Sequence, residues 1–139
     1  VREGLIDPEK SIQIGIRTHA PETCGLEILS GEDVEMLGVN GVVEMIEDRV
    51  GDAKAYMTFD IDCLDPAFAP GTGTPVSGGL SSREALMILR RLGELDFVGG
   101  DVVEVAPAYD HADITAIAGA SVAQHYFGLL AEKKAAGTS

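Results

Sequence analysis

The sequence predicts an α/β layered fold on a mainly parallel sheet, because strand-like and helix-like segments alternate along the chain. Short β-branched or apolar runs at 11–17, 54–62 and 97–107 are separated by segments with helical apolar spacing. Parallel strands need helical crossovers, which layer helices against the sheet. In such folds the functional residues collect in loops at the carboxyl ends of the strands.

The N-terminal part is predicted to hold two strands and then a helix. The β-branched run "SIQIGIR" (11–17) is the first strand, and "LEIL" (26–29) is a shorter second one. Ser30 and Asp33 resemble a capping box and predict a short helix through Leu37.

A second helix and a buried strand are predicted next. From Val39 to about Arg49 the apolar residues recur at helical spacing, and Gly51 ends this helix. The run "KAYMTFDID" (54–62) is largely apolar on both faces, as expected of a buried strand in a parallel sheet. A long loop of Gly, Pro and Thr follows at 63–80.

The C-terminal part is predicted to add a helix, a strand and a final helix. Ser81 and Glu84 form an S-x-x-E capping box at the start of a helix that Gly93 closes. The run "FVGGDVVEVAP" (97–107) is another strand, and 114–134 is a final helix with a broad apolar face.

Composition and charge exclude several classes of function. The 139 residues suit one globular domain, and the net charge of −13 argues against nucleic acid or an anionic membrane as partner. No apolar run approaches the roughly 20 residues that cross a bilayer, and no signal peptide leads the sequence. Because Cys24 and Cys63 fall in no disulfide-like spacing, the cytoplasm is the expected location.

Two carboxylates, Asp60 and Asp62, end the strand 54–62. Side chains at i and i+2 of a strand share a face, so the two would lie within about 6–7 Å of each other and repel. A cation such as Mn, Mg or Zn is the usual remedy. The alternative is that one Asp caps a turn while the other meets solvent; we assign that structural role to Asp65, which starts a turn with Pro66.

The segment "TFDIDCLDPAFAPGTGTPVSGG" (58–79) closely resembles the third signature of the ureohydrolase (arginase–agmatinase) family, and of its agmatinase branch in particular. The segments "QIGIRT" and "DVVEVAP" match in the same order. The resemblance implies that Asp60 bridges two Mn(II) ions and Asp62 binds one of them. It also implies that Glu104 meets the guanidinium of the substrate and that Thr74 lies at the substrate pocket.

The same resemblance implies a three-layer α-β-α sandwich that is incomplete here. The family's two other metal-binding motifs, which carry two histidines and two aspartates plus a proton-shuttle histidine, are absent, and the chain begins with Val1 rather than Met. Residues 1–139 are therefore expected to be the C-terminal portion of a single ureohydrolase domain with little activity alone. The complete protein is expected to form a trimer or hexamer.

The three histidines present do not replace the absent ligands. His19 follows a strand and is expected in solvent or a turn, although it could line the pocket. His111, in "YDHAD", is expected at the pocket rim or a subunit contact, and His125 on the apolar face of the last helix is expected to be packed or interfacial.

The predicted activity is hydrolysis of a linear guanidino compound to urea and an amine through a metal-bridging hydroxide. Agmatine and guanidinobutyrate both remain possible substrates, and the acidic chain favours the agmatine-like one. A non-catalytic assembly subunit that keeps half of the metal site is an alternative. An unrelated hydrolase with Asp60, Asp62 and Glu104 on one Mg ion ranks last.

Overall fold

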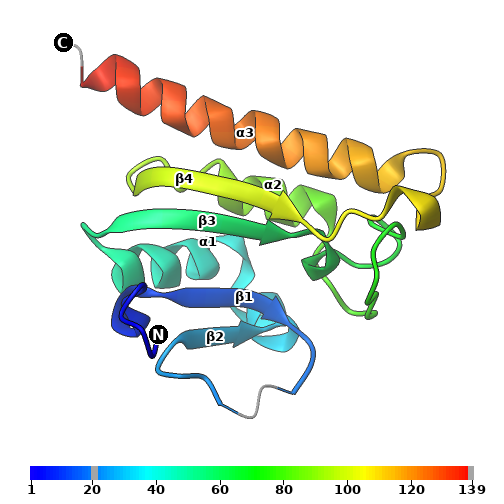
Figure 1. The fold of residues 1–139 in the computed structure, drawn as a ribbon, viewed down its shortest axis with the longest axis horizontal. Coiled ribbons are helices and arrows are strands. Elements are labelled where there is room, and N and C mark those ends of the chain that lie inside the picture. The colour runs from blue at the N-terminus through cyan, green and yellow to red at the C-terminus, as the bar shows by residue number, and fades with distance from the viewer. Residues whose placement is uncertain (20–21, 138–139) are drawn as a thin grey trace.

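The computed structural model describes residues 1–19 and 22–137. Four strands and three helices alternate along the chain (Figure 1). The strands are β1 (Ile12–Ile16), β2 (Glu27–Ser30), β3 (Lys54–Asp60) and β4 (Asp96–Val103), and the helices are α1 (Gly31–Val50), α2 (Ser82–Leu89) and α3 (Ile114–Ala136). Short 3₁₀ turns occupy Pro8–Lys10, Ile61–Cys63 and Pro107–Tyr109.

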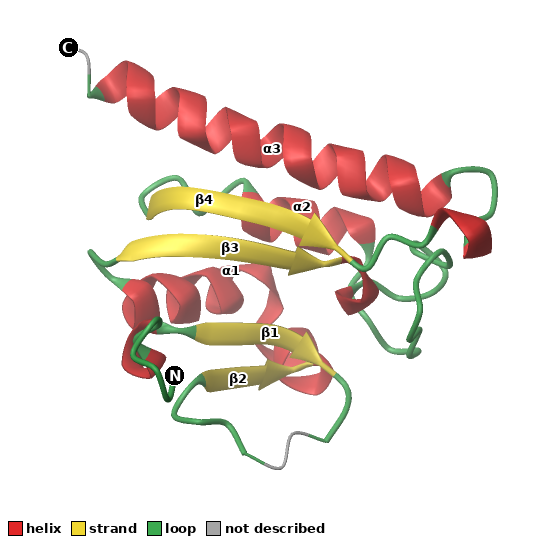
Figure 2. Cartoon of the chain, viewed as in Figure 1, coloured by secondary structure: helices red, strands yellow, loops and turns green. Residues whose placement is uncertain are grey.

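The strands form two parallel pairs. β1 pairs with β2 and β3 pairs with β4, and all four arrows run the same way in Figure 2. Within residues 1–19 and 22–137 no strand joins β1 to β3, although both line one cavity. The parallel α/β arrangement predicted from the sequence is confirmed, with an opening in the middle of the sheet.

The helices leave one face of the β3–β4 pair open. In the view of Figure 2, α1 and α2 lie behind the strands, while α3 runs alongside β4. Tyr56, on β3, is 62% exposed and donates a hydrogen bond to Asp101, on β4, across the open face. The expectation that both faces of β3 are buried is therefore wrong, since in the described part of the chain only one face is covered.

Both predicted capping boxes are present. The hydroxyl of Ser30 accepts the amide N–H of Asp33, whose carboxylate accepts the N–H of Ser30. Ser81 and Glu84 do the same at the start of α2. These reciprocal bonds satisfy amides that a helix start otherwise leaves unpaired, so each helix begins at a defined residue.

The predicted break within the first helical segment is confirmed, whereas the predicted end of α2 is not. The two helical stretches expected around 30–49 are continuous in α1 but are separated by a kink at Gly38, where φ is 64° and the backbone is not helical. Only glycine adopts that left-handed backbone readily, which explains why the apolar pattern shifts there. α2 ends with Arg90 as its C-cap, before the predicted stop at Gly93.

One apolar core lies between the helices and the strands. It includes Val42 and Ile46 of α1, Ile61 and Leu64 after β3, Ile88 and Leu89 of α2, and Val122, Tyr126 and Leu129 of α3. The ring of Tyr126 meets Phe97 of β4 edge to face, with centroids 5.5 Å apart, which joins α3 to the sheet.

By length and composition alone α3 could cross a membrane, since the 22-residue segment Ile114–Ala135 contains an 18-residue window with a mean hydropathy of 1.2. The expectation that no apolar segment approaches the length needed to cross a bilayer is therefore not met by α3. One such helix is weak evidence for a membrane span, because core helices pass the same test. Val122, Tyr126 and Leu129 of α3 are buried against the rest of the chain.

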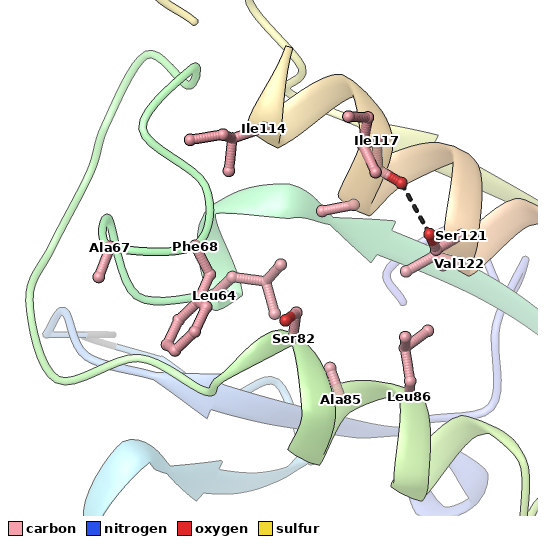
Figure 3. Close-up of a pocket in the computed structure, with 11 residues that line it drawn as sticks. Leu64, Ala67, Phe68, Ser82, Ala85, Leu86, Ile114, Ile117, Ser121 and Val122 are labelled. Carbon is pink, nitrogen blue, oxygen red and sulfur yellow. Dashed lines mark hydrogen bonds between the residues drawn. The ribbon is translucent and has the colours of Figure 1, made fainter. Parts of the chain in front are cut away.

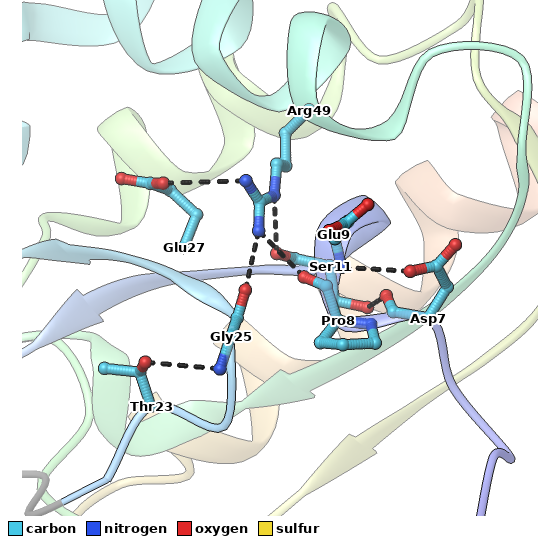
Figure 4. A network of polar contacts seen from close by, with 8 residues as sticks. All are labelled: Asp7, Pro8, Glu9, Ser11, Thr23, Gly25, Glu27 and Arg49. Atoms are coloured by element: carbon cyan, nitrogen blue, oxygen red, sulfur yellow. Dashed lines mark hydrogen bonds and ion pairs between the residues drawn. The ribbon is translucent and has the colours of Figure 1, made fainter.

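Arg49 of α1 holds together the amino ends of β1 and β2 (Figure 4). Its guanidinium donates to the carbonyl oxygens of Pro8 at 2.8 Å, Gly25 at 2.7 Å and Ser11 at 3.3 Å. A 3.8 Å ion pair with Glu27 completes this cluster. The two strands are thus fixed to α1 at the end away from their carboxyl termini.

The first turn of α3 is capped by a residue outside the helix. Asp113, at the N-cap position, has a left-handed φ of 58° and makes no capping bond. Instead Asp110 accepts the amides of His111 at 2.9 Å, Thr115 at 3.0 Å and Ala116 at 3.0 Å. Desolvation raises the pKa of Asp110, but these amides and the Thr115 side chain outweigh it and lower the pKa to about 2.

We expect Asp110 to make the stability of the chain pH-dependent in acid. Its folded pKa of about 2 lies below the ordinary 3.8, so its contribution is complete above pH 3.8 and disappears as the pH falls through 2. Urea unfolding of wild type and Asp110→Asn should therefore show a stability difference at pH 7 that narrows toward pH 2. Asp113→Asn is the matched control, and an equal effect of both variants would contradict this capping role.

Candidate functional site

The two predicted metal ligands are brought together by a turn. Asp60 is the last residue of β3, whereas Asp62 lies in the 3₁₀ turn Ile61–Cys63. The amide N–H of Asp62 donates to Asp60 Oδ1 at 3.1 Å, and Ile61 between them is fully buried. The premise that both carboxylates share one face of a strand was wrong, yet the pair is adjacent because the buried Ile61 anchors the turn.

A cavity of about 630 Å³ opens between β1 and β3, and both aspartates line it. Thr74, from the loop 63–80, also lines it and donates from Oγ1 to Asp62 Oδ2 at 2.8 Å. The rest of its wall is largely apolar side chains of β1, β3, α1 and α2, with Arg17 at the end of β1. The structure thus joins Asp60, Asp62 and Thr74 in one site.

Glu104 lies at the edge of the same site. It follows the last residue of β4, and its Oε2 would be 3.9 Å from a Cβ placed on Gly73, next to Thr74. Its φ of 63° is left-handed, a backbone conformation that costs a non-glycine residue free energy and that clusters at functional sites. Glu104 is exposed and beside the cavity rather than among its lining residues.

The electrostatics of the pair favour a cation. Partial burial raises the pKa of Asp60, and the charges of Asp62 and Glu104 raise it further, against the lowering effect of the Asp62 amide. Burial also raises the pKa of the Cys63 thiol to about 12, so this neighbour is uncharged at neutral pH. A hard cation beside the two carboxylates would offset their repulsion.

The carboxylate pair fits part of a metal-binding set. Oxygen ligands suit Mn(II) or Mg(II), but an ion of this kind needs more ligands than two aspartates provide. In residues 1–19 and 22–137 no group of three or more His, Cys, Asp or Glu side chains is arranged to hold a metal. Asp60 and Asp62 by themselves therefore supply only part of the ligands that such an ion needs.

The histidines lie away from the pair. His19 and His111 are exposed, and neither lines the cavity. His125, half-buried on α3, accepts from Arg90 Nε at 2.8 Å, which leaves its Nδ1–H to donate to the carbonyl of Ser121 at 2.7 Å. Its packed environment agrees with the sequence prediction.

Asp65 closes the base of the loop 63–80, as predicted. Its Oδ1 accepts the amide of Ala67 at 2.9 Å, and its Oδ2 accepts those of Gly78 at 2.8 Å and Gly79 at 3.3 Å. These amides, that of Ala67 most strongly, lower the pKa of Asp65. The carboxylate serves the loop and is not available as a metal ligand in this arrangement.

The middle of the loop is fixed at Gly71, an anchor that sequence reasoning missed. Its amide donates to Thr115 Oγ1 at 2.7 Å, and its carbonyl accepts the Ala106 amide at 2.7 Å. Thr115 is fully buried, and a Cβ on Gly71 would lie 2.6 Å from the Cβ of Asp110. No local pattern relates these residues, so the sequence carried no signal of the contact.

Arg17 was also missed. Its guanidinium donates to the carbonyl oxygens of Gly15 at 2.7 Å, Cys63 at 3.2 Å and Asp62, and twice to that of Val76 at 3.0 and 2.9 Å. The available signal was an arginine at the end of an otherwise apolar strand.

A second cavity of about 290 Å³ lies between α2, α3 and the start of the loop (Figure 3). Its wall is mostly apolar, with Leu64, Phe68 and Ile117 among the lining side chains. Ser121 lines it too, but its hydroxyl donates to the carbonyl of Ile117 at 2.8 Å. Among residues 1–19 and 22–137, no titratable side chain lines this cavity.

We expect Gly79→Ala to destabilise the chain, because the new Cβ would lie 2.5 Å from the amide N of Asp65 and 2.6 Å from the carbonyl C of Leu64. Overpacking against backbone typically costs about 1–3 kcal/mol. At Gly73 a Cβ would meet only Glu104, at 3.9 Å, so Gly73→Ala should change the free energy of unfolding by less than about 0.5 kcal/mol. Urea denaturation measures both; equal losses would mean that the loop base is not closely packed.

The chain is similar to known proteins both in sequence and in overall structure. The chain is 55% identical over 138 residues to an agmatinase of Chromobacterium violaceum, covering 99% of this chain and 43% of that protein. A crystal structure of a hypothetical agmatinase from Burkholderia thailandensis superposes with a TM-score of 0.95 at 55% identity, covering 96% of this chain and 42% of that one. For proclavaminate amidino hydrolase of Streptomyces clavuligerus the TM-score is 0.86 at 46% identity, covering 89% and 43%.

The chain thus spans less than half the length of these relatives, and the arginase-like fold expected from the resemblance is confirmed over the part it covers. A sequence profile described as "Arginase family" matches residues 1–128, which is most of the chain. Given this match and the superpositions, the chain belongs to the arginase family of ureohydrolases.

Proposed function

We propose that the protein containing this chain is a Mn(II)-dependent amidinohydrolase that hydrolyses a linear, agmatine-like guanidino compound to urea and an amine. The observation that carries the proposal is the repelling pair Asp60 and Asp62 in a cavity with Thr74, beside Glu104. The 55% identity to an agmatinase supports the same chemistry. The protein is further proposed to be a cytoplasmic homo-oligomer.

Each of these side chains has a role that its chemistry suits. Asp60 and Asp62 would hold Mn(II), and Thr74 fixes the rotamer of Asp62 through its hydrogen bond to Oδ2. When bound, the metal pair lowers the pKa of coordinated water and so supplies a nucleophile at neutral pH. Glu104 would bind the guanidinium by charge-assisted hydrogen bonds and orient its carbon.

The cavity also explains how the remaining ligands could reach the aspartates. The edges of β1 and β3 that border it are not hydrogen-bonded to each other, and Asp60 lies at the carboxyl end of β3. A segment of the protein outside these residues, seated between the two edges, would bring its side chains next to Asp60. Residues 1–139 alone should therefore bind Mn(II) weakly and release little urea.

The charges around the cavity favour a substrate whose far end is not a carboxylate. Arg17 is the one basic side chain among the described residues that line it. Its guanidinium already donates to four main-chain carbonyls, so it has no free pair of donors for a substrate carboxylate. This supports agmatine over guanidinobutyrate.

The test is Mn(II) titration calorimetry and urea release with the full-length protein that contains this chain. Wild type should bind two Mn(II) ions and release urea from agmatine faster than from 4-guanidinobutyrate. Asp62→Asn should weaken Mn(II) binding by more than the roughly 10–100-fold typical of an outer-shell partner, because it removes a direct ligand.

Asp101→Asn is the matched control, since Asp101 is an exposed aspartate of β4 bonded to Tyr56 outside the cavity. It should leave both readouts unchanged. Unaltered Mn(II) affinity in Asp62→Asn would overturn the assignment of this ligand. Tight stoichiometric binding by residues 1–139 alone would overturn the proposal that the remaining ligands come from elsewhere in the protein.

A further inference from the structure

We propose that Arg17 is a positioning residue that fixes Asp62 and Thr74 relative to each other, through hydrogen bonds to main-chain oxygens in and near these residues. The inference rests on the proposed function, because it concerns the geometry of the same metal and substrate site. Arg17 lies directly after β1, whereas three of its four partners, Asp62, Cys63 and Val76, lie 45 to 59 residues further along the chain.

All five N–H groups of the guanidinium are used. Nε and one Nη2 donor meet the carbonyl of Val76, the other Nη2 donor meets that of Asp62, and Nη1 meets those of Gly15 and Cys63. Every acceptor is a main-chain oxygen. Because all of its donors are occupied, this side chain holds the backbone in place and has none left to bind a substrate.

Three of the four acceptors of Arg17 lie in the two backbone segments that carry Asp62 and Thr74. Asp62 and Cys63 form the turn that carries the Asp62 carboxylate, and Val76 is two residues from Thr74. Arg17 therefore connects the two backbone segments whose side chains meet in the 2.8 Å bond from Thr74 Oγ1 to Asp62 Oδ2. The guanidinium fixes the main chains, and the hydroxyl fixes the carboxylate.

The surroundings of Arg17 are shaped to hold it. A Cβ on Gly31, the first residue of α1, would lie 3.2 Å from Arg17 Cγ, so the helix start packs closely on the aliphatic part of the side chain. Gly15 has a left-handed φ of 83°, and a Cβ there would lie 2.8 Å from Leu80 Cδ1. These two glycines let β1 and α1 approach the loop closely enough for the guanidinium to reach all four carbonyls.

Lysine could not replace this arrangement. Four main-chain carbonyls accept from this one side chain, and a planar guanidinium offers five donors in a fixed plane where an ammonium offers three. Arg17→Lys would keep the charge yet leave at least one carbonyl contact unmade. The turn and the loop would then move relative to each other.

The experiment compares Arg17→Lys with Arg49→Lys in the full-length protein. Arg49 is a matched control because its guanidinium also donates to main-chain carbonyls, those of Pro8, Ser11 and Gly25, but at the opposite end of β1 (Figure 4). Thermal unfolding of both variants first establishes that each is folded and how much stability each has lost. Mn(II) affinity by calorimetry and amide hydrogen exchange of the metal-free protein are then measured.

We expect Arg17→Lys to weaken Mn(II) binding by about 10–100-fold, as outer-shell partners do, and to speed amide exchange in residues 74–79. Arg49→Lys should change neither beyond what its loss of stability explains. Equal effects of the two variants on Mn(II) affinity and on exchange in 74–79 would overturn the positioning role. A wild-type protein that binds no Mn(II) and releases no urea would instead overturn the proposed function, and the inference with it.

Discussion

The repulsion between Asp60 and Asp62 is the constraint around which this part of the fold is organised. Partial burial raises the pKa of Asp60, and the neighbouring carboxylate of Asp62 raises it further, so the fold must hold the pair together against this repulsion. The fully buried Ile61 between them supplies that anchor, because turning either aspartate away would expose it. The burial of Ile61 thus keeps two like charges close together, and a bound metal ion would reduce their repulsion.

The loop 63–80 shows how an irregular segment becomes rigid. It forms only one isolated bridge, Leu64 to Leu80, yet side chains of Asp65, Thr115 and Arg17 bond its main chain at the base, the middle and near Thr74. Each bond satisfies a backbone group that would otherwise need water. Preorganised main chain of this kind lets a pocket wall keep its shape without a helix or strand beneath it.

The sequence predicted what depends on neighbouring residues. Both capping boxes, the positions of the four strands and the role of Asp65 follow from short-range patterns, and all are confirmed. Sequence-based prediction failed for features that depend on contacts between residues far apart in the chain. The exposed face of β3 reflects what packs on the sheet, and the Arg17 and Thr115 contacts join residues 44 or more positions apart. The pairing of Asp60 with Asp62 was expected from their spacing, whereas the place of Thr74 beside them came only from the family resemblance.

The opening between β1 and β3 divides the described part of the chain into two units of secondary structure. β1 and β2 form one hydrogen-bonded unit with α1, β3 and β4 form another with α3, and no ladder crosses from one to the other within the described residues. The two units share one apolar core, but within the described residues no backbone ladder fixes the spacing between them. The contacts between the two units therefore set the distance between the two sides of the cavity. The hydrogen bonds from the Arg17 guanidinium to Asp62, Cys63 and Val76 are among these contacts.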